Sequence, residues 1–589
     1  MGQEGNRNNP YSFDDYLFVR DRFNYYRDDP FFQALVKKYA GDEYEKVHAE
    51  LCDLSDRVSY YFRDLANEGG TIENRVRLTK LQHYDAHNRR IDRLHRPAET
   101  VELEKQVFGL GLLDPAKHSP FSRFVKLFLL YQNSEAGVMC GFGGTHGMVG
   151  LLEKYENTDL APEAREALTF LREGIERDGE RVYGIAGQYM SEIQGGSDVP
   201  ANLVEAVYEE AEGPDGVSNC WRIYGKKFFC SATQSDYTFL TAKPRGTDSS
   251  TKVATFLVPA WLPGNESKEI RNSYTIDRLK SKLGLAELPT AEITYNGAVA
   301  YPIGPLEDGL ANVVGVVLAL SRLHVAFGSA AGFTRIQREA SLYSQFRKAF
   351  GIPVGAFPLM MNQLSDVERC SKRTTAGAFK LYDEFIQNGE KLAAGTKDLE
   401  AIDDVDARRR LFRLRELVLL QKIAVTDEQP AMIRQCISFF GGHGIVEDFS
   451  SLPRMFRDSM IQELWEGPRN VLLTQIHRDF SKVAEWYPAD QFCRDVLAGA
   501  DDTIVEPLAK EFARLMTHPT LLMQDEETLA ICRDWEEFSN TLIEAYQDQA
   551  LAELAYKGKP LDFHELLGEF KAREEAGGLP PLGSTRIRR

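Results

Sequence analysis

Apolar side chains recur at helical spacing in the first third of the chain, up to residue 184. Residues 31–36 and 121–128 are two examples, with apolar positions three and four residues apart. Positions with this spacing share one face of an α-helix, which a globular protein buries against its core. The pattern therefore predicts that this part of the chain is mostly helical.

The pattern changes between residues 185 and 303. Short runs rich in β-branched and aromatic residues follow one another, as in Cys220–Gly225, Tyr237–Lys243, Val253–Pro259 and Ala291–Asn296. Gly, Pro, Asp and Ser separate these runs, as turns do between strands. This composition predicts a mainly antiparallel sheet or barrel inserted between helical parts.

Helical spacing returns after this segment and continues to the end of the chain. We therefore predict an α+β fold that is mainly α, because one helical layer precedes the sheet and a longer one follows it. The predicted parts are an N-terminal helical extension (1–110), a helical domain that completes the N-terminal part (111–184), a β domain (185–303), a C-terminal helical bundle (304–480) and a helical acidic C-terminal extension (481–589).

The net charge of the chain limits the classes of molecule that it is expected to bind. The 589 residues include 70 Lys and Arg against 88 Asp and Glu, a formal charge of −18. A nucleic-acid partner is therefore unfavoured, since phosphate backbones attract clustered positive charge. The most apolar run, Val313–Leu320, is far shorter than the ~20 residues that cross a bilayer, so no membrane partner is expected. Eight dispersed cysteines without a C-x-x-C pair, and a start without an apolar leader, predict a cytoplasmic location.

Two segments of the predicted β domain carry candidate binding residues. Met190–Val199 combines the hydroxyls of Ser191 and Ser197 with two glycines, which leave backbone N–H groups open to a ligand. The simpler interpretation of this segment is an ordinary turn. Further on, Phe229 and Ser231 are two residues apart, so in a strand they face the same side and can flank a flat ligand.

Two later segments carry candidate chemistry. Gly441 and Gly442 would let the backbone approach a pyrophosphate, and Glu466 lies between Trp465 and a glycine. A carboxylate beside a large aromatic ring is partly desolvated, which raises its pKa and its basicity. Taken alone, Glu466 is equally a solvated loop glutamate, and Arg347 is equally a member of a surface ion pair.

Taken in order, these motifs resemble the acyl-CoA dehydrogenase family, and within it the longer AidB-like branch. The resemblance covers residues 110–480 and rests on the order and approximate spacing of the motifs. They are Met190-SEIQGGSDV, Gly225-KKFFCSATQSD, Lys280-SKLG, Arg322, Arg347-KAFG, Phe440-GGHG and Trp465-EG. The resemblance implies the fold predicted above, FAD as cofactor and an acyl-CoA substrate.

Roles follow from the resemblance position by position. It implies that the flavin contacts the residues Met190, Ser191, Gly196, Ser197, Phe229 and Ser231. Ser197 and Arg322 match the substrate region, and Arg347, Phe350, Gly441 and Gly442 match groups that reach the FAD of a neighbouring subunit. A homodimer or homotetramer is thus implied. Pro468 and Arg469 replace small or hydroxylated residues of relatives, which leaves Asn470 as the polar contact.

Glu466 matches the catalytic base of the family. The implied reaction removes the α-proton of the acyl thioester while a hydride leaves the β-carbon for flavin N5, giving a 2-enoyl-CoA. The electrons would pass to an electron-transfer flavoprotein, a step of fatty acid metabolism.

Three alternatives stay open. An AidB-like FAD-binding protein would have a protective or ligand-binding role and weak dehydrogenase activity. The same fold also supports an oxidase that uses O₂, or an enzyme acting on a nitroalkane. A hydrolase or a metal site is disfavoured, because the H-E-x-x-H and G-x-S-x-G motifs are absent from the sequence.

Overall fold

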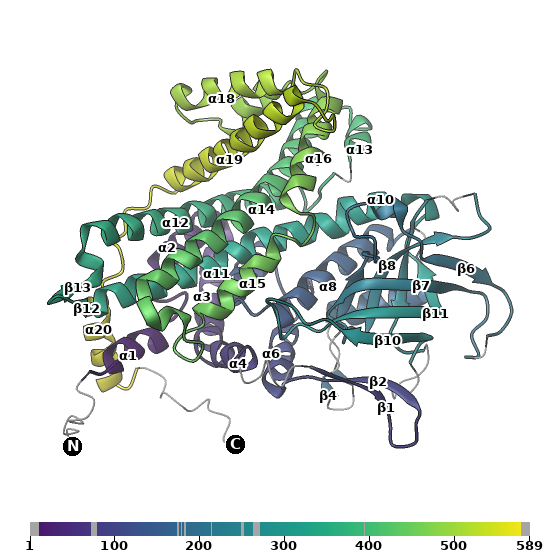
Figure 1. Ribbon diagram of the computed structural model, residues 1–589, viewed down its shortest axis with the longest axis horizontal. Coiled ribbons are helices and arrows are strands. Elements are labelled where there is room, and N and C mark those ends of the chain that lie inside the picture. The colour runs from purple at the N-terminus through teal and green to yellow at the C-terminus, as the bar shows by residue number, and fades with distance from the viewer. Residues whose placement is uncertain are drawn as a thin grey trace.

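The computed structural model describes residues 11–71, 79–158, 160–173, 176–177, 180–181, 184–213, 215–248, 252–262, 271–393 and 395–578. Helices come first along the chain, a sheet follows, and a larger set of helices completes it (Figure 1). The predicted fold class, α+β and mainly α, is confirmed. The boundaries drawn between its parts remain predictions.

The N-terminal part contains most of its residues in helices. These are α1 (Asp14–Arg22), α2 (Pro30–Tyr39), α3 (Tyr44–Asp56), α4 (Arg63–Gly69), α6 (Ala98–Phe108), α7 (Pro120–Tyr131), α8 (Ala136–Tyr155) and α9 (Pro162–Glu173). Helix α2 shows why such helices begin where they do. The Asp29 carboxylate accepts hydrogen bonds from the N–H groups of Phe31 and Phe32, and Pro30 fills the first helical position.

The expectation that residues 1–110 are helical is wrong over one segment. Strands β1 (Lys80–Tyr84) and β2 (Arg90–His95) form an antiparallel hairpin there. Its turn is closed by Asp85, whose carboxylate accepts hydrogen bonds from the N–H groups of His87 and Arg89. Exposed and partly buried residues alternate along β1, a period of two that the helical interpretation overlooked.

The central sheet has seven strands, shown on the right of Figure 1. They are β5 (Ala186–Tyr189), β6 (Glu205–Glu209), β7 (Cys220–Ser231), β8 (Tyr237–Pro244), β9 (Ala254–Pro259), β10 (Tyr274–Leu279) and β11 (Thr290–Pro302). Pairing follows the order β10-β11-β7-β6-β8-β5, and β9 joins β8 to β11, which closes a ring of strands. All pairs are antiparallel except β5–β8 and β6–β8. Two short strands, β3 (Glu176–Arg177) and β4 (Glu180–Arg181), pair separately.

Long helices form the bundle after the sheet. They are α10 (Gly309–Asn312), α11 (Leu318–Phe346), α12 (Pro358–Gln387), α13 (Thr396–Glu400), α14 (Val405–Phe440), α15 (Leu452–Gln462) and α16 (Arg469–Val483). A hairpin of β12 (Lys348–Ala349) and β13 (Ile352–Pro353) separates α11 from α12. The last helices are α17 (Ala489–Val496), α18 (Asp502–Leu515), α19 (Glu526–Leu554) and α20 (Phe563–Glu575). Helix α19 packs against α12, and α20 contacts α1 (Figure 1).

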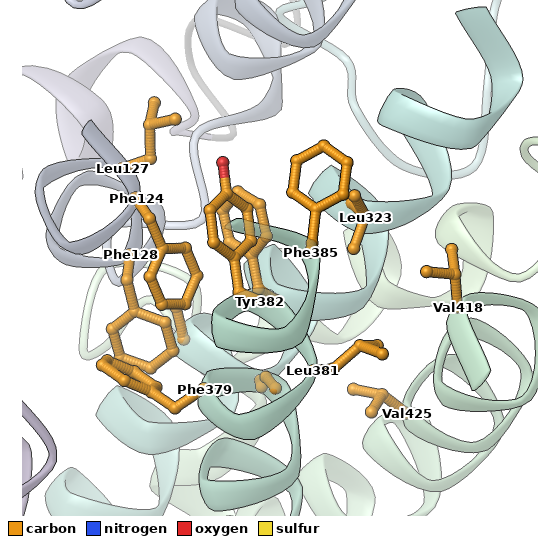
Figure 2. Close-up of a cluster of buried hydrophobic side chains, with 14 of the residues drawn as sticks. Phe124, Leu127, Phe128, Leu323, Phe379, Leu381, Tyr382, Phe385, Val418 and Val425 are labelled. Atoms are coloured by element: carbon orange, nitrogen blue, oxygen red, sulfur yellow. The ribbon is translucent and has the colours of Figure 1, made fainter. Parts of the chain in front are cut away.

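Aromatic side chains fill the contact between α7, α11 and α12 (Figure 2). The Phe124 and Tyr382 rings stack with centroids 3.9 Å apart, and the Phe379 ring lies 4.8 Å from Phe124 in an edge contact. Such rings bury large apolar areas, which is the main favourable term in folding. This cluster therefore joins the N-terminal helices to the bundle.

The segment Leu306–Phe346 is long and apolar enough to cross a membrane by length and composition. The most apolar 18-residue stretch of this segment is 61% buried by the rest of the chain. The buried residues Arg322, Arg335 and Arg338 also lie in the segment. The helical run is thus longer than Val313–Leu320, the run picked out in the sequence, and it lies in the core of the bundle.

Candidate functional site

The turn between α15 and α16 carries Glu466 in a strained conformation. Its backbone has φ +58°, in the left-handed region, and Gly467 follows with φ +101°. A residue other than glycine costs roughly 1–3 kcal/mol in such sparsely populated regions, so the surrounding structure must hold it there. The Glu466 side chain is partly buried.

Two buried cations hold the backbone of this turn. The Arg322 guanidinium, on α11, donates from Nε to the Glu466 carbonyl oxygen at 3.0 Å. The Lys422 ammonium, on α14, donates from Nζ to the carbonyl oxygens of Glu463 and Gly467 at 2.7 and 2.8 Å. Three carbonyls of one turn thus accept hydrogen bonds from charged donors, which are the stronger kind.

The same cations set the charge of the Glu466 carboxyl. Burial raises its pKa above the usual range, while the charges of Arg322 and Lys422 and a hydrogen bond from Ser321 oppose the rise. Burial also lowers the pKa of Lys422 to about 8. Burial makes this carboxylate more basic, and the neighbouring cations still favour its ionised form. Such a carboxylate is suited to accept a proton near neutral pH.

The β domain reaches this turn at two points. The Ser321 hydroxyl, which hydrogen-bonds Glu466, lies 3.3 Å from Oε1 of Gln188, two residues before Met190. Trp465 packs in a small apolar cluster with Ala232, the neighbour of Ser231. The structure therefore brings the chain around Met190 and Ser231 to the same junction as Glu466.

A buried ion pair fixes the loop that carries Ser191, Gly196 and Ser197. The Glu192 carboxylate accepts hydrogen bonds from the N–H groups of Leu203 and Val204 at 2.6 and 3.1 Å. The Lys227 ammonium lies 3.0 Å from Glu192 and donates to the Met190 carbonyl at 3.2 Å. Both side chains are buried, and Lys227 belongs to β7, so this ion pair anchors the loop to that strand.

The open face of this loop fits a planar, polar ligand. A Cβ at position 196 would lie 2.4 Å from the Ser191 hydroxyl, so glycine leaves that hydroxyl accessible. The Phe229 ring is 51% exposed, and the Ser231 hydroxyl, on the same face of β7, is 3.1 Å from that of Thr290. An exposed aromatic ring with hydroxyl groups nearby matches what a flavin ring requires. Ser197 is exposed on the same loop.

A second group of predicted residues lies elsewhere. Arg347 donates to the Phe440 carbonyl at 2.9 Å, and a Cβ on Gly441 would lie 3.0 Å from its guanidinium. Gly442 follows Gly441 and is exposed. Phe350 is 97% exposed at the tip of the β12–β13 hairpin, where its φ is +52°. At about 1.5 Å per residue, α11 places Arg347 about 37 Å from Arg322. One chain therefore does not bring this group to Glu466.

Asn470 lies in the first turn of α16, four residues after Glu466, and is exposed. Its neighbour Arg469 points toward α19, where it bonds Glu536 and Asn540, each at 2.7 Å. Arg469 is thereby engaged by the C-terminal extension.

A small cleft lies beside Arg322. Its lining is mostly apolar and consists of Val314, Ala319, Leu392, Ala393, Val418 and Leu419, with Arg322 and Arg415 at one side. A larger cleft lies between α2, α11, α12 and the segment before α20, away from Glu466. We assign the smaller cleft to the site because Arg322 lines it and also contacts Glu466.

The sequence analysis missed Ser321, Lys422 and Gln188. A signal for Lys422 was present, because it interrupts the apolar run Leu417–Val425 in the middle of a helix. A lysine in such a run is buried only when it has partners. Ser321 and Gln188 carry no comparable local signal.

Similarity to known proteins agrees with this geometry. A family model of the acyl-CoA dehydrogenase C-terminal domain matches residues 307–480. Acyl-CoA dehydrogenase family member 11 of Caenorhabditis elegans is 30% identical over 474 residues, which are 78% of this chain and 71% of the relative. The chain belongs to the acyl-CoA dehydrogenase family. Members of the acyl-CoA dehydrogenase family bind FAD.

Two further similarities extend beyond the common core of the family. The putative acyl-CoA dehydrogenase AidB of Escherichia coli is 27% identical over 77% of this chain and 81% of its own. The solved structure of C. elegans ACDH-11 in complex with C11-CoA superimposes with a TM-score of 0.72 at 24% identity. It covers 94% of this chain and 95% of that one, so both extensions belong to a fold already known in the family.

Proposed function

We propose that this protein is an FAD-dependent dehydrogenase that introduces an α,β double bond into an acyl-CoA, with Glu466 as the proton acceptor. The observation that carries the proposal is the environment of Glu466. Its carboxylate is desolvated, is flanked by two cations and lies where the β domain meets the helical bundle. This combination is typical of a general base.

Residues of the β domain would hold the cofactor. Met190, Ser191 and Gly196 lie on the anchored loop, and Phe229 and Ser231 offer a ring and a hydroxyl on β7. When bound, FAD supplies the acceptor for the hydride that leaves the substrate. The protein's own residues orient the two reactants and move the proton.

The proton step belongs to Glu466. Its raised pKa makes the carboxylate a stronger base than a solvated glutamate. The C11-CoA bound by ACDH-11 supports an acyl-CoA as the substrate.

The partners follow from the same proposal. The electrons would pass to an electron-transfer flavoprotein. The exposed Phe350 hairpin, with Arg347, Gly441 and Gly442 beside it, supports a homodimer or homotetramer in which this group reaches the FAD of a neighbouring subunit. In such an assembly, this group of residues, which lies far from Glu466 of its own chain, would serve the site of the neighbouring chain.

The proposal is tested by anaerobic addition of a graded series of acyl-CoA thioesters to the purified yellow protein. Bleaching of the flavin absorbance is expected with at least one chain length, and Glu466→Gln should keep its flavin and lose the bleaching. Glu527→Gln, at an exposed position in the first turn of α19, is the matched control and should bleach normally. A wild-type flavin that stays oxidised with every thioester would overturn the proposal.

The AidB-like alternative is supported by the similarity to E. coli AidB. It predicts a protein that binds FAD and an acyl-CoA but reduces its flavin only slowly. The same titration decides between the two, because binding without bleaching would favour the alternative.

A further inference from the structure

The side chain of Lys422 is a fully buried cation that does not reach the protein surface. It lies in the middle of α14 with 0% of its surface exposed, among Leu419, Leu420 and Ile423. Burial of a lysine is costly unless its ammonium finds partners. Its partners are backbone carbonyls of the turn that carries Glu466.

The two carbonyls lie on either side of Glu466. Glu463 precedes it by three residues and Gly467 follows it directly, and both accept a hydrogen bond from the same ammonium. Together these contacts limit rotation of the turn about its own axis. Since Glu466 has a positive φ, release of the turn would let it relax toward a more populated conformation and would redirect its side chain.

We propose that Lys422 is a positioning residue for Glu466: it pins the turn on both sides of the base and places a positive charge near its carboxylate. This inference rests on the proposed function, because Glu466 must be the base for its position to matter.

Charged and polar groups reach Glu466 from three helices and from its own turn, where the Glu463 carboxylate is a charged neighbour of Lys422. Helix α11 contributes Arg322 and the Ser321 hydroxyl, α14 contributes Lys422, and α8 contributes the Cys140 thiol, whose pKa is raised to about 12 by burial and by Glu466. Behind Arg322 lie Arg415, Glu416 and Asp479. Within this set, Arg322 and Lys422 are the cations that lower the pKa of Glu466.

A purely packing role for Lys422 predicts a different outcome from a positioning role. Methionine has a similar length and no charge, and an apolar residue often replaces a buried ion without loss of stability. Lys422→Met is therefore expected to fold and to bind FAD. Lys422→Arg keeps the charge and the ability to donate to both carbonyls, and it serves as the conservative control.

The test measures removal of the α-proton separately from hydride transfer. Protein whose flavin is kept reduced with dithionite is mixed with an acyl-CoA in D₂O, and deuterium at the α-carbon is followed by mass spectrometry as a function of pH. Misplacement of a reacting group by about 1 Å costs up to about 100-fold. We expect Lys422→Met to exchange roughly 10- to 100-fold more slowly than wild type, with the acid limb of the profile moved to higher pH. Lys422→Arg should restore the position of the limb.

If Lys422→Met exchanges more slowly but the acid limb of its pH profile is unmoved, Lys422 has only a structural role and the inference is overturned. A pH profile of Lys422→Met equal to that of wild type would also overturn it. Hydrogen–deuterium exchange of backbone amides 463–470, without any acyl-CoA, is the second measurement. The turn should exchange faster in Lys422→Met than in wild type, and equal protection would overturn the inference independently of the reaction. Wild-type protein that binds FAD but exchanges no α-proton would instead overturn the proposed function, and the amide measurement would still test the contact.

Discussion

The Arg322 guanidinium lies 3.0 Å from the carbonyl oxygen of Glu466, 144 residues further along the chain. The resemblance placed Arg322 in the substrate region, and the structure adds a backbone partner on the residue that we propose as the base. Arg322 is buried, and burial lowers its pKa to about 10. Both the position and the pKa of Glu466 thus depend in part on Arg322.

Arg322→Met is expected to raise the pKa of Glu466, because one of two opposing cations is lost. The acid limb of the pH profile for flavin reduction should move to higher pH. Arg322→Lys should restore the limb but recover only part of the rate, since a lysine lacks the planar, multi-donor geometry of the guanidinium. Stopped-flow reduction across pH measures both effects, and an unmoved limb in Arg322→Met would contradict this expectation.

Lys227→Met should weaken binding of FAD and lower stability together. It leaves the buried Glu192 carboxylate without its cation, and breaking a buried pair costs about 3–5 kcal/mol. The double variant Lys227→Met/Glu192→Gln should recover part of that loss, because the unpaired charge is gone. Urea unfolding and FAD titration of the three proteins measure the effects. Equal FAD affinity in all of them would show that this ion pair does not position the loop.

A pH dependence of stability is expected from Glu416, which is 0% exposed. Burial raises its pKa to about 8 from an ordinary value of 4.5, so the folded state binds this proton more tightly than the unfolded state. Its contribution to stability is therefore present below pH 4.5 and is lost as the pH rises to about 8.

The difference in melting temperature between wild type and Glu416→Gln should decrease as the pH rises from 4.5 to about 8, and should be constant above that pH. A difference that is constant with pH would mean that Glu416 does not titrate in this way.

Phe124→Ala should cost about 3–5 kcal/mol of unfolding free energy, since it leaves a cavity among aromatic rings that cannot collapse fully. The Phe124 ring stacks on Tyr382 at 3.9 Å, and its side chain is fully buried. Leu529→Ala, at an exposed position, is the matched control and should change stability by less than about 0.5 kcal/mol. Denaturant unfolding followed by circular dichroism compares them.

Phe350→Ser should shift the protein toward smaller assemblies without unfolding it. The ring is 97% exposed in one chain, so its removal costs little within that chain, and its burial in an interface would contribute about 1.5–3 kcal/mol. Light scattering coupled to size-exclusion chromatography measures the mass. An unchanged assembly with unchanged FAD content would argue against the hairpin as a subunit contact.

Much of the fold was predictable because its signals are local. Periodicity separated helices from strands, and the ordered motifs pointed to the family, whereas the β1–β2 hairpin was missed within a stretch otherwise helical. A raised pKa of Glu466 was expected from the sequence, and in the structure its cause is burial.

The contacts that hold Glu466 were not predictable. Lys422 and Arg322 act on backbone carbonyls 41 to 144 residues away, and only the packed arrangement of α11, α14 and the turn determines which carbonyls they reach. Nothing in the spacing of residues along the chain encodes such contacts.

Helix α11 runs without interruption from Leu318 to Phe346, with Arg322 near its start and Arg347 directly after its end. One inserted residue between them would turn everything beyond it by about 100° and advance it by about 1.5 Å. The guanidinium of Arg347 would then lose the carbonyl of Phe440, or that of Arg322 would lose Glu466. Apolar residues along this stretch tolerate substitutions that keep their volume, but the length of the stretch cannot change, because both ends are in register with distant partners.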